Sequence, residues 1–217
     1  MARLCAILIY MVSNKNECGV GKRAYTLRAR ARRQEDVHQR ITLAAVHLHE
    51  TVGPARTTMS EIAKIAGVQR ATVYNHFPTE LDLIGACSSH WFAENPPPDP
   101  TPWAEISDPG RRTETALTAM YGYYERGRPM LENVLRDATL VAALEEIIEQ
   151  KWSPMMEGIV ELLAEGWESR QPELRASIRV ALDFFTWRTL ATSGLSNDEA
   201  ARLTATWIGS NRNPSLF

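Results

Sequence analysis

The chain has 217 residues, of which 44% are apolar and 23% charged, a composition typical of ordinary globular proteins. Its three cysteines are widely spaced and form no CxxC pair, which argues against a disulfide framework or a zinc site and fits a reducing compartment. The net charge of −2 is unevenly distributed: residues 1–95 hold 12 Lys and Arg against 8 Asp and Glu, a net of +4, and the rest hold 12 against 18, a net of −6. This asymmetry suggests that the N-terminal half faces a polyanion.

The N-terminal residues 1–20 show no clear period. The run LCAILIYMV (residues 4–12) is too short to span a membrane. It resembles a truncated signal peptide, but no small-residue cleavage site follows. We expect a disordered or misassigned extension, with translation from Met11 as one alternative.

The next segment, GKRAYTLRARARR (residues 21–33), is basic and contains no acid. One interpretation is a solvated tail or helix start. The other is an arm that follows DNA phosphates or enters a minor groove. The segment alone does not separate the two.

The first helical pattern covers residues 35–52, where apolar residues recur at three- and four-residue spacing and Gly53-Pro54 ends the run. A second helix follows Thr58, whose spacing to Glu61 predicts a capping box. We expect Gly67 to stop this helix with a positive φ. Its buried side is predicted to consist of Ile62, Ile65 and Ala66.

A third, short helix is predicted at about residues 69–75, closed by Pro78. Thr79 can cap a fourth helix that runs to about Glu94. The following NPPPDPTP (residues 95–102) contains five prolines in eight residues, so we expect a stiff, extended linker rather than helix.

Beyond the linker every segment predicts helix, and we find no alternating strand pattern and no internal repeat. The expected helices cover residues 111–126, 129–150, 152–168, 172–193 and 197–209.

Two short helices joined by a glycine turn and braced by a preceding helix are typical of a helix-turn-helix. Its second helix would expose polar side chains to the major groove, where Arg and Gln reach two base-edge atoms and a Thr methyl meets a thymine methyl. Hydroxyl and imidazole groups, and a helix N-terminus, would meet phosphates. The alternative is a surface hairpin in an unrelated helical protein. The candidate DNA-binding residues are Lys22, Arg23, Arg28, Arg30, Arg32, Arg33, Thr58, Gln69, Arg70, Ala71, Thr72, Tyr74, Asn75 and His76.

Residues 41–84 resemble the N-terminal DNA-binding region of TetR/AcrR-family transcriptional regulators. The resemblance is carried by AA at 44–45, Gly53, TT at 57–58, IA at 62–63, AGV at 66–68 and TVYNHFP at 72–78. It implies an all-helical, dimeric, cytoplasmic and nucleoid-associated repressor of a double-stranded, pseudo-palindromic operator. It also implies that the divergent C-terminal region binds a small apolar or amphipathic molecule and forms the homodimer interface.

The chain departs from the family pattern at three positions. Gln69 stands where the family usually has a capping serine, which sacrifices about 1 kcal/mol of helix capping for a longer base-reading side chain. Glu80 replaces the usual lysine at the start of the fourth helix. His49 replaces a core phenylalanine.

The predicted fold is therefore all-α with about nine helices. A three-helix helix-turn-helix DNA-binding domain precedes a helical ligand-binding and dimerisation domain. The expected divisions are a flexible extension with the basic arm at 1–33, the DNA-binding domain with its connecting helix at 34–94, the linker at 95–102, and the second domain at 103–217.

No motif locates the ligand pocket, so its candidates come from residue type, since methionine and aromatic side chains suit an adaptable apolar cavity. Such a stripe is more often plain core. Arg136 and Asp137 fit an ion pair, a ligand anchor or a solvated helix edge. The pocket candidates are Trp103, Tyr121, Tyr124, Met130, Asn133, Arg136, Asp137, Trp152, Met155, Met156, Phe184 and Trp187.

The last two predicted helices alternate small residues with large aromatics, which allows close approach in a four-helix interface. Packing within one subunit is the alternative. The dimer-interface candidates are Ala181, Phe185, Arg188, Ala201, Thr204, Trp207 and Ile208.

We expect no enzyme, cofactor, metal or membrane partner. The five histidines form no ligand-spaced set, and GxSxG, P-loop and phosphate-cradling glycine patterns are missing from the sequence. Two functions stay open: a ligand-responsive DNA-binding regulator, most simply a repressor, or a helical interaction protein that keeps the fold, binds DNA weakly and acts through a protein partner.

Overall fold

The structure, a computed structural model, describes residues 3–167 and 172–210, with side chains from Tyr25 onward except that of Thr26. All regular elements in these ranges are helical, as predicted. They are α1 (Arg3–Thr51), η1 (Pro54–Arg56), α2 (Met59–Ala66), α3 (Arg70–His76), α4 (Glu80–Glu94), α5 (Thr101–Ala104), α6 (Pro109–Asp137), α7 (Ala142–Ile147), η2 (Ile148–Trp152), α8 (Ser153–Ala164), α9 (Pro172–Leu182), α10 (Phe184–Thr192) and α11 (Asn197–Ser210). No helix within the described ranges is both long and apolar enough to cross a bilayer.

Helices α1 to α4 form a small bundle with its own core. The C-terminal half of α1 packs against α2 and α4, and α3 packs against α2. One prediction is wrong: Ile65 is 49% exposed, and Ala63 takes its place on the buried side of α2. The buried apolar residues are Ile41, Ala44, Ala45, Leu48, Ile62, Ala63, Ala66, Val73, Phe77, Leu83 and Cys87.

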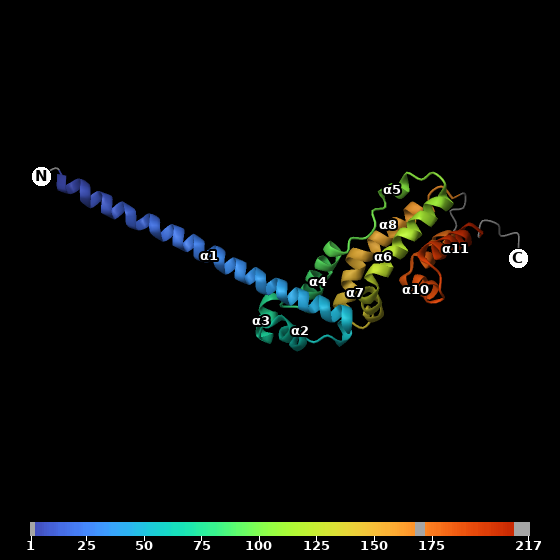
Figure 1. The fold of residues 1–217 in the computed structure, drawn as a ribbon, viewed down its shortest axis with the longest axis horizontal. Coiled ribbons are helices and arrows are strands. Elements are labelled where there is room, and N and C mark those ends of the chain that lie inside the picture. The colour runs from blue at the N-terminus through green and yellow to red at the C-terminus, as the bar shows by residue number, and fades with distance from the viewer. Residues whose placement is uncertain (1–2, 168–171, 211–217) are drawn as a thin grey trace.

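Helix α1 is much longer than the pattern at residues 35–52 predicts, because it begins at Arg3. Figure 1 shows its N-terminal part projecting away from the rest of the molecule as a single rod. Residues 21–33 contain five Arg and three Ala and no proline, so their helix propensity is high, although none of their described side chains is buried. The basic segment is therefore helical in its backbone.

The C-terminal region is built around α6, which packs against α11, α8 and α9 (Figure 1). The sequence predicts a break near residue 127, but α6 continues through Pro129 to Asp137. An internal proline costs about 3 kcal/mol. Burial of Tyr124, Met130 and Leu131 around it outweighs that cost, since each such side chain contributes roughly 1.5–3 kcal/mol.

Two further boundaries differ from the predictions. Residues 138–141 interrupt the helix predicted at 129–150. Asp183 interrupts the one predicted at 172–193 because its carboxylate caps α10, accepting from the Thr186 N–H at 3.0 Å.

The proline-rich segment is extended up to Pro100, but Thr101 and Pro102 begin α5. This corrects the prediction that residues 95–102 contain no helix. Pro102 is compatible with a helix because it lies in the first turn, where no backbone N–H is needed. Trp103 then anchors α5 in the C-terminal core, with 4% of its surface exposed.

Candidate nucleic-acid interface and ligand cavity

Short-range hydrogen bonds define the α2–turn–α3 unit. The Thr58 hydroxyl accepts from the Glu61 N–H at 3.2 Å, and the Glu61 carboxylate accepts from the Thr58 N–H at 3.0 Å. Gly67 ends α2 with φ 65°, a conformation that favours glycine. The predicted capping box and glycine stop are both confirmed. They fix the start of α2 and the turn before α3 locally, and Arg40 on α1 adds a hydrogen bond to the Ala66 carbonyl at 3.0 Å.

Helix α3 buries one side and exposes the other. Val73 is fully buried, and Phe77 just beyond the helix is 2% exposed. Gln69 caps α3 without a side-chain hydrogen bond, so its amide is available for other contacts. The outer side presents Gln69, Arg70, Ala71, Tyr74 and Asn75, with Thr72 half-buried beside them.

Arg70 and Tyr74 are already in contact one turn apart. The Arg70 guanidinium donates to the Tyr74 hydroxyl at 3.0 Å and lies 5.5 Å from its ring centroid. This contact limits the freedom of both side chains before any partner arrives. The phenol proton remains available as a donor to a phosphate oxygen.

The C-terminal end of α3 is less exposed than its outer side, and acidic side chains follow it. His76 is half-buried, with its ring 6.1 Å from that of His38 on α1. Beyond α3, Thr79 and Asp82 form the capping box of α4, and Glu80 is exposed in the same first turn. Two carboxylates therefore stand at the N-terminus of α4, where they favour the helix but repel phosphate.

Basic side chains in the N-terminal region are unpaired. Between Tyr25 and His76, the described cations form no salt bridge. Lys22 and Arg23 lie within α1, but their side chains are outside the described set. The exposed arginines of the arm are Arg28, Arg30, Arg32 and Arg33.

The α1–α2 loop is attached to the end of α6 by three side chains, here called the clasp: Asn133, Arg136 and Asp137. Asn133 donates to the Glu50 carbonyl at 2.7 Å, and the Arg136 guanidinium donates to the Val52 carbonyl at 3.3 Å. Asp137 accepts from the Ala55 N–H at 3.0 Å and from Arg136.

Charge and backbone geometry both support the clasp. Burial opposes ionisation of Asp137, but the bonds from Arg136 and the Ala55 N–H outweigh it and hold the pKa of this carboxyl below its usual value. Gly53 is required here, because its φ is 95° and a Cβ would lie 2.3 Å from Arg136 and 2.4 Å from Asp137.

An enclosed cavity of about 60 Å³ lies beside the clasp, between the N-terminal bundle and α6. Its wall is almost entirely apolar and includes the C-terminal end of α1 and the loop after it, through His49 and Pro54, as well as α4 and the C-terminal part of α6. The lining residues are His49, Pro54, Ile84, Cys87, Ser88, Trp91, Phe92, Met130, Leu131, Val134, Leu135, Leu144, Ile147, Ile148 and Trp152.

His49 is a buried titratable side chain of this wall. It is 6% exposed, and burial lowers its pKa from 6.5 to about 4, against a smaller opposite effect of Asp137. The imidazole is therefore neutral at physiological pH. Cys87 lies nearby, and burial raises its thiol pKa to about 12, so it is unreactive.

The structure divides the predicted pocket residues into several groups. Met130 and Trp152 line the enclosed cavity. A more open hollow of about 290 Å³, here called the outer groove, is lined in part by Tyr124, Trp152, Met156 and Phe184. The enclosed cavity also uses Trp91 and Phe92, which the sequence reasoning missed because it searched only beyond the proline-rich segment.

The other pocket candidates have different environments. Trp103, Tyr121 and Trp187 are packed in the C-terminal core, and Tyr121 donates to the Ala181 carbonyl at 2.8 Å. Met155 is half-buried on α8 and lines neither hollow. Asn133, Arg136 and Asp137 belong to the clasp, where Arg136 and Asp137 form an ion pair. Asn133 and Arg136 also line an open hollow of about 560 Å³, together with Phe185 and Arg188.

The predicted interface residues also divide by burial. Ala181, Ala201, Thr204 and Ile208 are at most 1% exposed, so they pack within their own subunit and have no surface for a partner. Phe185 and Arg188 are half-buried, and Trp207 is 57% exposed. Sequence reasoning missed Val180 and Leu203, each 50% exposed. The spacing of Leu203 and Trp207, one helical turn apart, is the signal that could have found this face.

The described residues contain no group of three His, Cys, Asp or Glu placed to hold a metal ion. The one buried side-chain oxygen or nitrogen without a hydrogen-bond partner in these ranges is the Tyr123 hydroxyl.

Comparison with known proteins bears on both regions. Residues 41–87 match the sequence model of the family described as bacterial regulatory proteins, tetR family. No curated protein matches the chain.

Solved structures match over most of the chain. A TetR-like transcriptional regulator from Rhodococcus sp. RHA1 is 20% identical, with 82% of this chain and 97% of that chain covered and a TM-score of 0.59. A TetR transcription regulator from Haloarcula marismortui is 19% identical, covering 82% and 98%, with a TM-score of 0.57. NalD, the secondary repressor of the MexAB-OprM multidrug efflux pump in Pseudomonas aeruginosa, is 20% identical, covering 81% and 95%, with a TM-score of 0.56. At these identities the likeness establishes a shared fold.

Proposed function

We propose that this chain, a member of the TetR family of bacterial regulatory proteins, represses transcription by binding a DNA operator as a homodimer and releases it when a small molecule enters the C-terminal region. Membership of the family and the shared fold support a DNA-binding transcriptional regulator. Repression, the ligand and the residues that serve each step are our proposal. We place DNA binding in the region before the proline-rich segment, and ligand binding and dimer formation in the region after it.

The observation that carries DNA binding is the combination of an exposed polar face on α3 with unpaired cations on α1. Arg70 and Gln69 can each reach two base-edge atoms, and the arm arginines supply phosphate contacts. A carboxylate partner would neutralise these cations, and among the described residues they have none.

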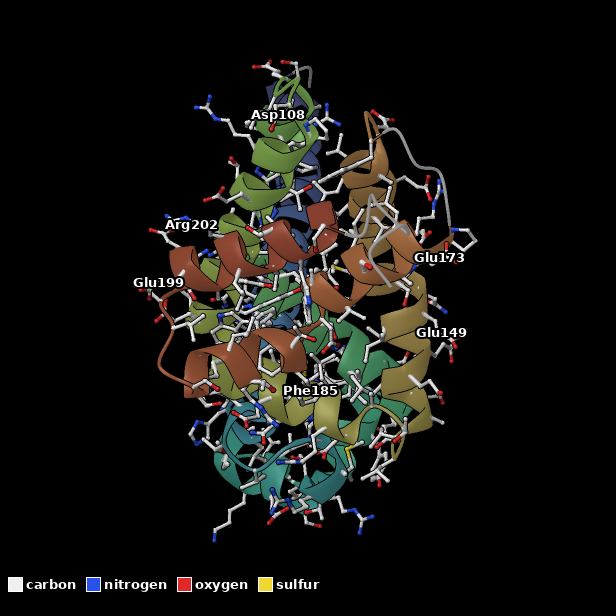
Figure 2. All side chains as sticks on the ribbon, turned by 90° about the vertical axis from the view of Figure 1, so that its right-hand side faces the viewer. Asp108, Glu149, Glu173, Phe185, Glu199 and Arg202 are labelled. Carbon is white, nitrogen blue, oxygen red and sulfur yellow. The ribbon has the colours of Figure 1, made fainter. Side chains whose placement is uncertain are left out.

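Dimer formation is supported by an apolar stripe on α9 and α11. Val180, Leu203 and Trp207 are each at least half exposed, although most apolar side chains of these two helices are buried. Figure 2 views the molecule from the end that carries α10 and α11, with Phe185, Glu199 and Arg202 labelled on it. A dimer through this end would present two recognition helices, and its half-sites should lie roughly 34–36 Å apart.

Trp207→Ala is expected to weaken the dimer strongly, because a large exposed aromatic at an interface centre commonly contributes 2 kcal/mol or more. Sizing chromatography across a concentration series checks this. Trp103→Phe, a change in a core tryptophan of the same chain, is the control for general damage. A dimer of unchanged affinity would place the interface elsewhere.

Ligand control is supported by the shared use of α6. Met130, Leu131 and Val134 line the enclosed cavity, and the clasp begins at Asn133 on the same helix. A molecule that enlarges the cavity must move at least one of the elements that line it, which include α4, α6, α7 and η2. Movement of α6 would shift the α1–α2 loop and thereby change the separation of the two recognition helices.

The decisive experiment is an electrophoretic shift on DNA from upstream of the protein's own gene, at salt concentrations from 50 to 200 mM. If 6–10 phosphates are contacted, affinity should fall about 10³–10⁵-fold over that range. Absent or salt-independent binding would reject DNA regulation and favour the alternative, a helical interaction protein with a protein partner. Glu80, exposed where the family usually has a basic residue, is the observation that favours this alternative.

A further inference from the structure

Trp152 lies against two aromatic rings that come from different helices. Its indole is nearly parallel to Phe92 on α4, at 20° and 6.1 Å between centroids, and to Tyr123 on α6, at 20° and 6.2 Å. Trp91 contacts both of these rings edge-on. The space bounded by Phe92, Tyr123 and Trp91, here called the aromatic slot, therefore has the shape of a planar ring system, and Trp152 occupies it.

The same indole separates two hollows. Trp152 and Leu135 line both the enclosed cavity and the outer groove. The cavity of about 60 Å³ has room for a few water molecules only. Small-molecule sites usually measure about 300–1,000 Å³. If Trp152 turned outward, the two hollows would join and reach that range.

Tyr123 adds a polar group that the fold itself does not use. It is 1% exposed, and its hydroxyl has no hydrogen-bond partner within the described residues. The neighbouring Tyr121 and Tyr124 donate to the carbonyls of Ala181 and Leu182 at 2.8 and 2.6 Å. Burial raises the pKa of Tyr123 above its usual value, so the phenol stays protonated and can donate. An unpaired buried hydroxyl destabilises a protein, and functional sites are where such a cost is usually found.

The backbone that carries Trp152 is also irregular. Residues Ile148–Trp152 form a single π-helical turn between α7 and α8, and such turns occur often at functional sites. On the side of α4, this turn is held by one polar contact, from the Lys151 ammonium to the Ser89 hydroxyl at 3.0 Å. Withdrawal of the indole would therefore break mainly the apolar contacts of Ile148 and Trp152.

We propose that the aromatic slot is a ligand site that Trp152 fills in the free protein. The ligand class is a neutral, planar aromatic molecule that displaces the indole, stacks on Phe92 and Tyr123 and accepts a hydrogen bond from the Tyr123 hydroxyl. It should be neutral because the enclosed cavity, where the indole would be displaced, is lined by no Asp, Glu, Lys or Arg; the charged residues Glu157, Arg179 and Asp183 line only the outer groove. The inference rests on the proposed function only in taking this ligand as the regulatory signal.

Quinoline and naphthalene are suitable probes, because they have the same shape and only quinoline carries a hydrogen-bond acceptor. Each is titrated calorimetrically into the full chain without DNA. Trp152→Ala should bind both probes at least tenfold more tightly than the unmodified chain, and Trp152→Phe should be intermediate. Trp152→Ala should also bind quinoline about tenfold more tightly than naphthalene. Adding Tyr123→Phe to this variant should remove that preference and leave its naphthalene affinity unchanged. Tyr121→Phe, which alters a hydroxyl paired elsewhere, should leave the preference unchanged.

Thermal unfolding gives a test that needs no change at Trp152. Tyr123→Phe should raise Tm because it removes an unpaired buried hydroxyl, and Tyr121→Phe should lower it. The proposal is overturned if neither Trp152 variant binds more tightly, if the quinoline preference survives Tyr123→Phe, or if Tyr123→Phe lowers Tm. An electrophoretic shift on the same variants without probe should be unchanged, and loss of DNA binding by the unmodified chain would instead reject the proposed function.

Discussion

The N-terminal and C-terminal regions of the molecule differ in how far their arginines are paired with carboxylates. In the C-terminal region six arginines lie in salt bridges, namely Arg128, Arg136, Arg175, Arg179, Arg188 and Arg202, whereas the described Arg111, Arg112 and Arg126 do not. In the described part of the N-terminal region no basic side chain does so. Net charge alone hides this difference. The number of basic residues in a region is therefore a weaker guide to polyanion binding than the number without a carboxylate partner.

The largest expected effect tests this comparison directly. Replacing Arg28, Arg30, Arg32 and Arg33 together by Gln should weaken binding to all DNA sequences alike. It should also reduce the slope of log affinity against log salt by up to about seven, since the homodimer loses eight arginines and each lost phosphate contact contributes about 0.9. Binding measured at several salt concentrations checks both.

The control is the matching change of four paired arginines, Arg128, Arg175, Arg179 and Arg202, to Gln. It should leave the salt slope unchanged. Equal slopes for the two quadruple variants would mean that pairing does not decide which cations meet DNA.

The junction of the two regions supplies a second test, because its buried histidine must stay uncharged. His49 has a folded pKa of about 4 against 6.5 in the unfolded chain. Between these values the unfolded state binds more protons, so stability should fall as pH falls from 6.5 to 4, by roughly 3 kcal/mol in total. Urea unfolding at pH 7, 6 and 5 measures this slope. His49→Phe should flatten it, and a slope that persists in the variant would assign it to another group.

A smaller effect separates base reading from phosphate contact within the N-terminal region. Arg70→Ala should cost about 1–3 kcal/mol on the operator and relax preference at one base pair. Competition among single-base operator variants measures this. Uniform weakening across all variants would make Arg70 a phosphate contact like the arm.

The smallest effect concerns the acid at the start of α4. Glu80→Lys should tighten DNA binding by about one phosphate contact, without sequence preference. Glu105→Lys, an exposed change outside the N-terminal bundle, is the control. Unchanged or weaker binding would mean that Glu80 points away from DNA.

Local signals were sufficient for much of the N-terminal region. The capping boxes of α2 (Thr58 with Glu61) and α4 (Thr79 with Asp82) satisfy backbone N–H groups within one turn. Gly67 adopts the positive φ that its position requires. Such features depend on a few neighbouring residues. The orientation of Ile65 depends on how α2 rotates against α1, which no local pattern specifies.

The C-terminal region was less predictable because long-range packing decides it. The burial around Pro129 overrides a strong local helix breaker. Asp137 looks like a possible ligand anchor in the sequence, yet its partner is a backbone N–H 82 residues away. Small residues such as Ala201 read as an interface, but α6 of the same subunit already covers them.

Because α1 is long, a small tilt at its C-terminal end, beside the clasp, would displace its N-terminal end much further. From Ile41, where α1 is held in the bundle, to Arg3 the helix extends about 57 Å at 1.5 Å per residue. A tilt of about 5° at the bundle end would therefore displace the N-terminal end of α1 by roughly 5 Å. The arginines of the proposed arm, Arg28 to Arg33, lie about 12–20 Å along the helix from Ile41, so the same tilt would move them by roughly 1–2 Å.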